Sequence, residues 1–191
     1  MGAEPKRGVH DSDRVEQRTV RSRRAGPTDA ATIAVTLAEA FDGYGAWAPA
    51  GWSPPKQGPE VTRGLAEALS RADVWCLLAE SGSEPVGHVA LSLTTAVQPE
   101  RAPTGVVNLW QLFVRRAWQG GGAAPLLMQA ALTEAARREF GRLRLWTPRG
   151  AARARRFYER EGWALTGNER EESPLGLPIL EYTRGVPKLG A

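Results

Sequence analysis

Residues 106–140 read VVNLWQLFVRRAWQGGGAAPLLMQAALTEAARREF, and they predict a strand, a glycine-rich turn and a helix in direct succession. The run VVNLWQLFV (106–114) is typical of a buried strand, and PLLMQAALTEAARREF (125–140) has apolar residues at helical spacing. Between them, three glycines (120–122) permit a left-handed backbone and carry no side chain that would block a ligand. Free N–H groups at the start of the helix favour a phosphate, although a flexible connector would also explain the glycines.

Two well-known phosphate-binding motifs do not fit this turn. A Walker A loop needs Gly-Lys-Ser or Gly-Lys-Thr after its glycines, and none follows here. A dinucleotide fingerprint needs G-x-G-x-x-G near the first strand of its domain and an acidic residue after the next strand. In this chain the next strand ends in LWTP (145–148). The turn is therefore a candidate phosphate site of another kind.

The rest of the chain alternates strands and helices without an internal repeat. Strands are predicted at 17–25, 73–80, 86–96, 106–114, 143–148, 163–168 and 178–185, and helices at 28–41, 61–72, 125–140 and 151–162. Thr28 is expected to cap the first helix, and Gly141 to end the third. The order β-α-α-β-β-β-α-β-α-β-β predicts one α/β domain over 16–187, between a flexible tail at 1–15 and a short tail at 188–191.

Composition argues against several classes of protein. The net charge of +4 suits anionic ligands but is too small to indicate nucleic-acid binding, and the arginine-rich segment 18–24 lacks interleaved aromatic residues. Cys76 is the only cysteine, and with two histidines no disulfide and no metal site are expected. There is no apolar run of about 18 residues and no secretory signal, so we expect a cytoplasmic protein without membrane contact.

Two motifs in the second half of the chain resemble those of GNAT N-acetyltransferases. Gln-x-x-Gly-x-Ala at 119–124, five residues after Val114, is similar to the family's acetyl-CoA motif. RFYEREGW (156–163) resembles the family's A-x-x-x-Y-E-K-x-G-F segment, with Ala154 and Tyr158 in register. The predicted order of elements is also that of the family. The resemblance implies an α/β (α+β) GNAT fold. Its central sheet would be mixed and mostly antiparallel, with about six or seven strands, about four flanking helices and a splayed, V-shaped acetyl-CoA slot.

The same resemblance implies acetyl-CoA as the acyl donor. Pantetheine would pair with the end of the strand at 112–114, and the pyrophosphate would meet the backbone amides of 120–124. The implied cofactor-binding residues are Leu112, Phe113, Val114, Gln119, Gly120, Gly121, Gly122, Ala123, Ala124, Pro125, Ala151, Ala154 and Phe157. Three positions depart from the family pattern without removing the site: Arg116 replaces a frequent proline, Ala151 replaces a frequent asparagine, and Pro125 has no N–H group.

By the same match, Tyr158 corresponds to the family's general acid. Attack of an amine on a thioester expels a thiolate. A phenol has a pKa of about 10 and a thiol one of about 8.5, so a nearby tyrosine can supply the proton at modest cost. The alternative is that Tyr158 only packs against the cofactor. A backbone N–H near Phe113 would stabilise the oxyanion.

The general base is not assigned by the sequence. Some family members carry a glutamate six residues before the strand valine, where this chain has Asn108, and Gln111 is no better as a base. The remaining candidates are Asp42, Glu80, Glu100 and His88. For His88 the alternative is a histidine that serves only to pack the sheet.

Aromatic residues suggest a substrate pocket. The candidate substrate-binding residues are Tyr44, Trp47, Trp52 and Trp110, which could stack on a ring or hold a cationic amine. The loop tryptophans could instead close the core edge or a homodimer interface. Carboxylates of Asp42, Glu60 or Glu100 could pair with the amine.

The leading functional hypothesis is direct transfer of an acetyl group to the primary amine of a small molecule in a ternary complex. The alternatives are a protein or peptide N-acetyltransferase and a non-catalytic acyl-CoA-binding module.

Overall fold

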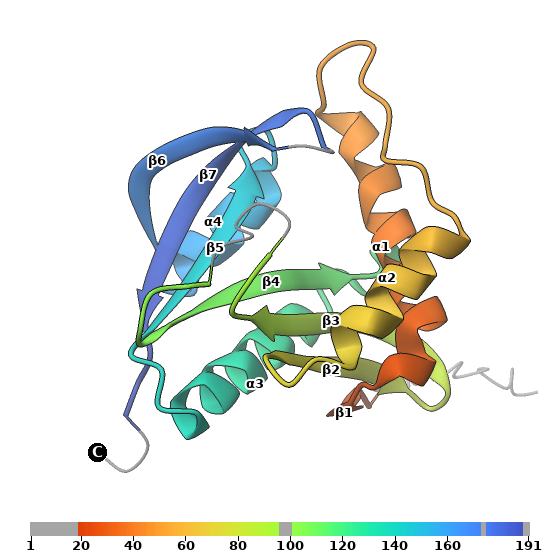
Figure 1. The fold of residues 1–191 in the computed structure, drawn as a ribbon. Coiled ribbons are helices and arrows are strands. Elements are labelled where there is room, and N and C mark those ends of the chain that lie inside the picture. The colour runs from red at the N-terminus through yellow and green to blue at the C-terminus, as the bar shows by residue number, and fades with distance from the viewer. Residues whose placement is uncertain (1–18, 96–100, 173–174, 189–191) are drawn as a thin grey trace, which may run out of the picture.

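A computed structural model describes residues 19–95, 101–172 and 175–188. The predicted tail at 1–15, Glu100 and residues 189–191 lie outside these ranges. The described chain forms one seven-stranded sheet of order β1-β2-β3-β4-β5-β7-β6, with four α-helices (Figure 1). The strands are β1 (Arg21–Arg24), β2 (Val74–Ser81), β3 (Glu84–Ser92), β4 (Val106–Val114), β5 (Arg142–Pro148), β6 (Ala164–Glu172) and β7 (Leu177–Gly185). The helices are α1 (Ala30–Asp42), α2 (Pro59–Leu69), α3 (Ala123–Arg137) and α4 (Ala152–Arg160).

Two apolar layers cover the two faces of the sheet. Successive residues of β2 alternate between them: Trp75 and Ala79 join the layer beneath α3 and α4, whereas Cys76 and Leu78 join the layer beneath α1 and α2. This is the alternation that the pleat of a strand imposes. Because both faces are covered, the strands are largely buried, which explains the almost continuous apolar runs in β2 to β4.

The predicted order of elements and the GNAT-type α/β fold are confirmed, but some element ends are not where the sequence placed them. Thr28 does not cap α1. It lies in a 3-10 helix (Pro27–Asp29) whose Asp29 carboxylate accepts the Gly26 N–H at 2.9 Å, and α1 begins only at Ala30. Gly141 does not end α3. The helix stops at Arg137, and Glu139 takes the left-handed conformation, with φ 61°.

The pairing of β4 with β5 is short. The two strands run parallel and pair only at Val106–Arg142, Val107–Leu143 and Asn108–Arg144, although β4 continues to Val114 and β5 to Pro148. Beyond Asn108 they diverge, because β4 stays paired with β3 and β5 stays paired with β7 along its whole length. The sheet therefore opens as a V, which Figure 1 shows between the green and cyan strands.

Candidate active site

The glycine turn lies at the open end of the V. After β4 the chain forms a 3-10 helix (Arg116–Trp118), and Gly120 and Gly122 then take positive φ values of 89° and 86°. Gly122 is the N-cap of α3, so the amides of Ala123 and Ala124 are among the first in the helix and have no intrahelical acceptor. These conformations favour glycine, and they direct amide groups away from the helix end, as a phosphate requires.

The same turn leaves space where a ligand would lie. Gly120, Gly121 and Gly122 are exposed, and a Cβ at Gly120 or Gly122 would meet no atom within 4 Å apart from the neighbouring residues. The Gln119 side chain does not occupy the space, because its Nε2 donates to the Val114 carbonyl at 3.1 Å and closes the turn. The sequence-predicted residues 119–125 therefore form one cradle, whose shape and donors fit the pyrophosphate of an acyl-CoA.

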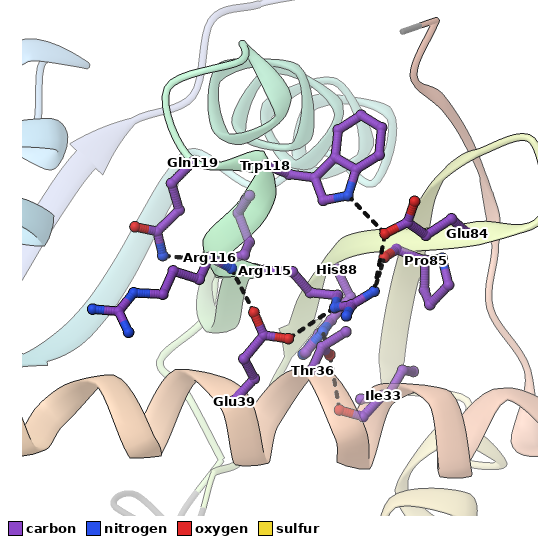
Figure 2. Close-up of polar contacts among 11 residues, drawn as sticks. Ile33, Thr36, Glu39, Glu84, Pro85, His88, Arg115, Arg116, Trp118 and Gln119 are labelled. Carbon is purple, nitrogen blue, oxygen red and sulfur yellow. Dashed lines mark hydrogen bonds and ion pairs between the residues drawn. The ribbon is translucent and has the colours of Figure 1, made fainter.

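A polar network holds this turn against α1 (Figure 2). One Glu39 oxygen accepts the Arg116 backbone N–H at 2.6 Å, and the other accepts Nε of Arg115 at 2.8 Å. Both hydrogen bonds hold the pKa of the Glu39 carboxyl below its usual range, with Arg115 making the larger contribution. Trp118 Nε1 donates to Glu84 at 3.2 Å on the far side of the turn. The sequence analysis did not identify Glu39, because its partners lie 76 and 77 residues away.

A cavity of about 450 Å³ fills the opening between β4 and β5. Asn108, Trp110 and Phe113 line it from β4, Leu145 and Trp146 from β5, and Phe41 and Tyr44 from α1 and the turn that follows. The part of β4 at 112–114, the predicted pantetheine-binding segment, is paired with β3 but not with β5, and it borders both the cavity and the glycine cradle. A second cavity of about 520 Å³ lies under α2, and five lining residues are common to both cavities: Leu37, Val61, Thr95, Trp110 and Gln111.

The four predicted substrate-binding aromatics divide into two groups. Tyr44 and Trp110 line the first cavity. Trp47 instead packs on Gly150, where a Cβ would come within 2.5 Å of its ring, and Trp52 donates Nε1 to the Leu175 carbonyl at 2.7 Å. Tyr44 lies 4.6 Å from Trp47 and 6.0 Å from Trp52 between ring centroids. The two tryptophans therefore support Tyr44 and tie the α1–α2 connection to the segment before β7.

Tyr158 lies in the core and is not among the residues that line either cavity. It is 8% exposed on α4, and its ring contacts Trp163 and Tyr182 at centroid distances of 5.9 and 6.3 Å. Burial raises the pKa of Tyr158 well above its ordinary value, and Tyr44, which lines the cavity, adds to the rise. The phenol therefore stays protonated at neutral pH, which is the form that a general acid needs. Of the other predicted residues of this region, Ala154 and Phe157 pack against the same core, and Ala151 is the buried N-cap of α4.

None of the candidate bases in the described residues lines either cavity. Asp42 is exposed at the end of α1, and Glu80 is paired with Arg23 at 2.9 Å. His88 is fully buried between Thr36 and Gln111, and burial lowers its pKa to about 4. Asn108, at the position of the family's glutamate, lines the first cavity and accepts Nε of Arg144 at 2.9 Å. The arrangement thus contains a buried acid and no carboxylate base at the cavity among the described residues.

A sheet that opens as a V beside a glycine-rich turn is the arrangement of an α/β acyltransferase. Comparison with known proteins identifies the family: residues 39–163 match the acetyltransferase (GNAT) family, so the chain belongs to it and is a GNAT-type acetyltransferase. Among curated proteins, none matches the chain significantly by sequence.

Solved structures share the fold at low sequence identity. The ribosomal-protein-alanine N-acetyltransferase from Brucella melitensis superposes with a TM-score of 0.69 at 19% identity, covering 86% of this chain and 99% of that one. A GNAT-family acetyltransferase from Staphylococcus aureus gives 0.66 at 12% identity, covering 88% and 100%. The PaiA N-acetyltransferase from Thermoplasma acidophilum, solved with coenzyme A, gives 0.62 at 14% identity, covering 85% and 98%.

Two further findings concern the described residues alone. None of their helices is both long and apolar enough to cross a membrane. No three of their histidine, cysteine, aspartate and glutamate side chains come together in a way that could hold a metal ion.

Proposed function

We propose that this protein is an acetyl-CoA-dependent N-acetyltransferase that acts on the primary amine of a small molecule. The observation that carries the proposal is the cavity in the opening between β4 and β5, next to the glycine cradle at the end of the same β4 strand. A thioester held along the strand would meet an amine held in the cavity.

Different residues of the chain would bind the two parts of the cofactor. The backbone of Leu112, Phe113 and Val114, on the β4 edge that turns away from β5, would hold pantetheine as an added strand. Amides of the glycine cradle and the first turn of α3 would hold the pyrophosphate. Pro125 has no N–H to contribute but is well tolerated in the first turn of a helix.

Acetyl-CoA supplies an activated acetyl thioester when bound. In the transfer, the amine nitrogen forms a bond to the acetyl carbon, the carbon–sulfur bond breaks, and the leaving sulfur takes up a proton. Tyr158 would donate that proton, because its phenol is buried, protonated and electrostatically linked to Tyr44 at the cavity. With no described carboxylate lining the cavity, the proton of the ammonium would leave through water.

A small-molecule acceptor is favoured over a protein acceptor by the way the cavity is covered. The bond from Trp52 to the Leu175 carbonyl joins two segments, 123 residues apart, across the mouth of the V. An open groove for a polypeptide would need these segments apart. The Brucella melitensis neighbour acts on a ribosomal protein by its name, so a peptide acceptor stays the alternative function. The cytoplasmic location and the homodimer stay predictions from the sequence.

The test measures acetyl-CoA turnover with a panel of small amines and of peptides with free N-termini. Free-thiol release reports the rate, and mass spectrometry identifies the products. We expect acetylated small amines, with kcat/KM for the best of them at least about tenfold above any peptide. Efficient turnover of peptides alone would contradict the small-molecule proposal and favour the alternative.

A further inference from the structure

The first cavity offers an amine no anionic partner. Among the described residues that line it, Lys56 is the only charged one. An amine held there therefore needs an uncharged oxygen that accepts from its N–H groups. Two buried side chains in the wall carry an amide oxygen, Asn108 and Gln111, and both lie on β4. The Asn108 oxygen already accepts Nε of Arg144 at 2.9 Å, so Gln111 is the candidate that remains.

Gln111 lies where the two cavities meet, because the register of β4 is irregular there. Ala90 pairs with Gln111 and Leu91 pairs with Leu109, so Trp110 is the extra residue of a β-bulge. In a regular strand, neighbouring side chains point to opposite faces. At the bulge this alternation is interrupted, and the neighbours Trp110 and Gln111 both line both cavities.

A chain of hydrogen bonds behind Gln111 fixes the tautomer of buried His88. The Thr36 hydroxyl has one proton, and it donates this proton to the Ile33 carbonyl at 2.8 Å. Nδ1 of His88 lies 2.7 Å from the same hydroxyl oxygen, so Nδ1 is the donor of this second bond. Burial lowers the pKa of His88 to about 4, so the ring is neutral at pH 7 and carries only this one proton. Nε2 of His88 is therefore an acceptor.

This tautomer determines which way the Gln111 amide points. In the structure Oε1 of Gln111 lies 3.1 Å from Nε2 of His88, and with the ring proton on Nδ1 both atoms are acceptors. A half turn of the carboxamide exchanges its oxygen and nitrogen with almost no change in shape, and it lets Nε2 of Gln111 donate to the ring. The far end of the amide has no hydrogen-bond partner among the described residues. It is also not one of the partnerless side-chain atoms that are sealed from solvent, so it faces the cavities.

We propose that Gln111 holds the nitrogen of the acceptor amine: its amide is turned so that Nε2 donates to His88 and Oε1 accepts an N–H of the amine. The inference rests on the proposed function and deepens it. An amide oxygen accepts from an ammonium ion and from a neutral amine alike, but it is too weakly basic to keep the proton. It therefore orients the nitrogen both before and after the proton leaves to water. Gln111 is then a substrate-binding residue, whereas His88 and Thr36, which line neither cavity, are positioning residues.

The tautomer of His88 is the direct readout of this arrangement. The chain has only two histidines, so His10→Gln leaves His88 as the single histidine signal in ¹H–¹⁵N spectra of the ring. We expect the proton on Nδ1 at pH 7. A proton on Nε2 would overturn the proposal, because the ring would then donate to Oε1 of Gln111 and the amide nitrogen would face the cavities.

Phenethylamine is the probe for the role of Gln111, because its ring suits a cavity lined by Phe41, Tyr44 and Trp110. Gln111→Met keeps the length of the side chain and removes its oxygen. We expect kcat/KM for phenethylamine to fall about tenfold, as for the loss of one hydrogen bond, while the Kd for CoA changes less than about twofold. Gln129→Met, on the exposed side of α3, is the matched control and should behave as the unmodified protein. An unchanged kcat/KM in Gln111→Met would overturn the proposal.

The positioning role of His88 is tested by loss and by rescue. His88→Leu removes the acceptor for Nε2 of Gln111, so the amide oxygen is no longer held toward the cavity and kcat/KM should fall about three- to tenfold. His88→Gln offers a carbonyl oxygen to Gln111 and an N–H to Thr36, and it should restore at least about half of the unmodified kcat/KM. In the Gln111→Met background, His88→Leu should cause no further loss, because His88 acts through Gln111. Additive losses, or no rescue by glutamine, would overturn this role.

Failure of this inference differs from failure of the proposed function. Turnover of phenethylamine that does not depend on Gln111 overturns the inference alone. If no small amine is acetylated, the proposed function fails, and binding decides the inference instead. By calorimetry, the CoA-loaded protein should then still bind phenethylamine at least about fivefold more tightly than CoA-loaded Gln111→Met does. Equal affinities, or no binding to either protein, would overturn the inference as well.

Discussion

At the scale of single residues, burial determines the protonation state of Tyr158. The sequence motif predicts that Tyr158 is a proton donor. In the structure Trp163 and Tyr182 surround its ring in the core, where ionisation of the phenol is unfavourable. A buried, protonated phenol can act as an acid but not as a base. The role that we propose for Tyr158 is therefore protonation of the leaving thiolate and not activation of the amine.

We expect Tyr158→Phe to lower kcat about 100-fold, because a positioned general acid commonly contributes that much, while the Kd for CoA changes less than about twofold. Thiol release gives kcat, and calorimetry gives Kd. Tyr182→Phe is the matched control. It deletes a buried phenol whose hydroxyl bonds Glu159 at 2.9 Å, and it should lower stability but leave kcat near that of the unmodified protein. An unaltered kcat in Tyr158→Phe would mean that this residue only packs in the core and donates no proton.

His88 gives a prediction for stability. Its pKa is lowered by burial from 6.5 to about 4, so between these values the unfolded chain binds more protons than the folded one. The contribution of neutral His88 to the free energy of unfolding is therefore complete above about pH 6.5. It is lost as the pH falls toward 4, and the loss is at most about 3 kcal/mol. When unfolding by denaturant is measured, the His88→Gln variant should lose less free energy of unfolding at acid pH than the unmodified protein. If both proteins lose the same free energy of unfolding from pH 7 to 4.5, His88 does not titrate as described.

At the scale of elements, the unit formed by β4, the glycine turn and α3 is the site that we propose for the cofactor. Gly122→Glu puts an anion into the cradle at a residue with φ 86° and should raise the Kd for acetyl-CoA at least about 100-fold. Gly167→Glu is the control for backbone strain, since Gly167 has φ 87° in the edge strand β6, away from the cradle. Equal loss of binding in both variants would mean that strain, and not occupation of the phosphate site, is responsible.

The contact of α1 with the turn predicts an effect at a distance from the ligand. Glu39→Gln weakens the bonds to Arg115 and to the Arg116 amide, which are partly exposed, so about 1 kcal/mol of support for the turn should be lost. We expect a Kd for CoA about three- to tenfold higher by calorimetry. Glu67→Gln on exposed α2 should leave it unchanged. An unaffected Kd in Glu39→Gln would show that the turn holds its shape without α1.

The elements also show what the sequence could and could not predict. The start of α3 was predictable, because a glycine triplet between apolar runs has a specific local meaning. Its end was not, since Gly141 suited a cap but Glu139 adopted the left-handed conformation after the helix had stopped. Glu39 depends on partners 76 and 77 residues away, and nothing in its local pattern distinguishes it from a solvated glutamate.

At the scale of the whole molecule, the site results from a competition between strand partners. β4 stays paired with β3, and β5 stays paired with β7. The two strands β4 and β5 therefore separate after three residue pairs and leave the central opening. The family motifs predicted this opening, but not which side chains would wall it. Trp47 and Trp52 were expected at the substrate and instead support Tyr44, because packing on Gly150 and bonding to Leu175 depend on the folded arrangement of distant segments.

We expect CoA to bind between the edge of β4 that turns away from β5 and the glycine cradle. Hydrogen exchange measured with and without CoA tests it directly, with Gly122→Glu as the variant that should not respond. We predict slower exchange on binding in peptides covering 109–114 and 119–127, and little change in β1 and β2. Tight binding of CoA that leaves exchange in 109–114 and 119–127 unchanged would contradict this binding mode.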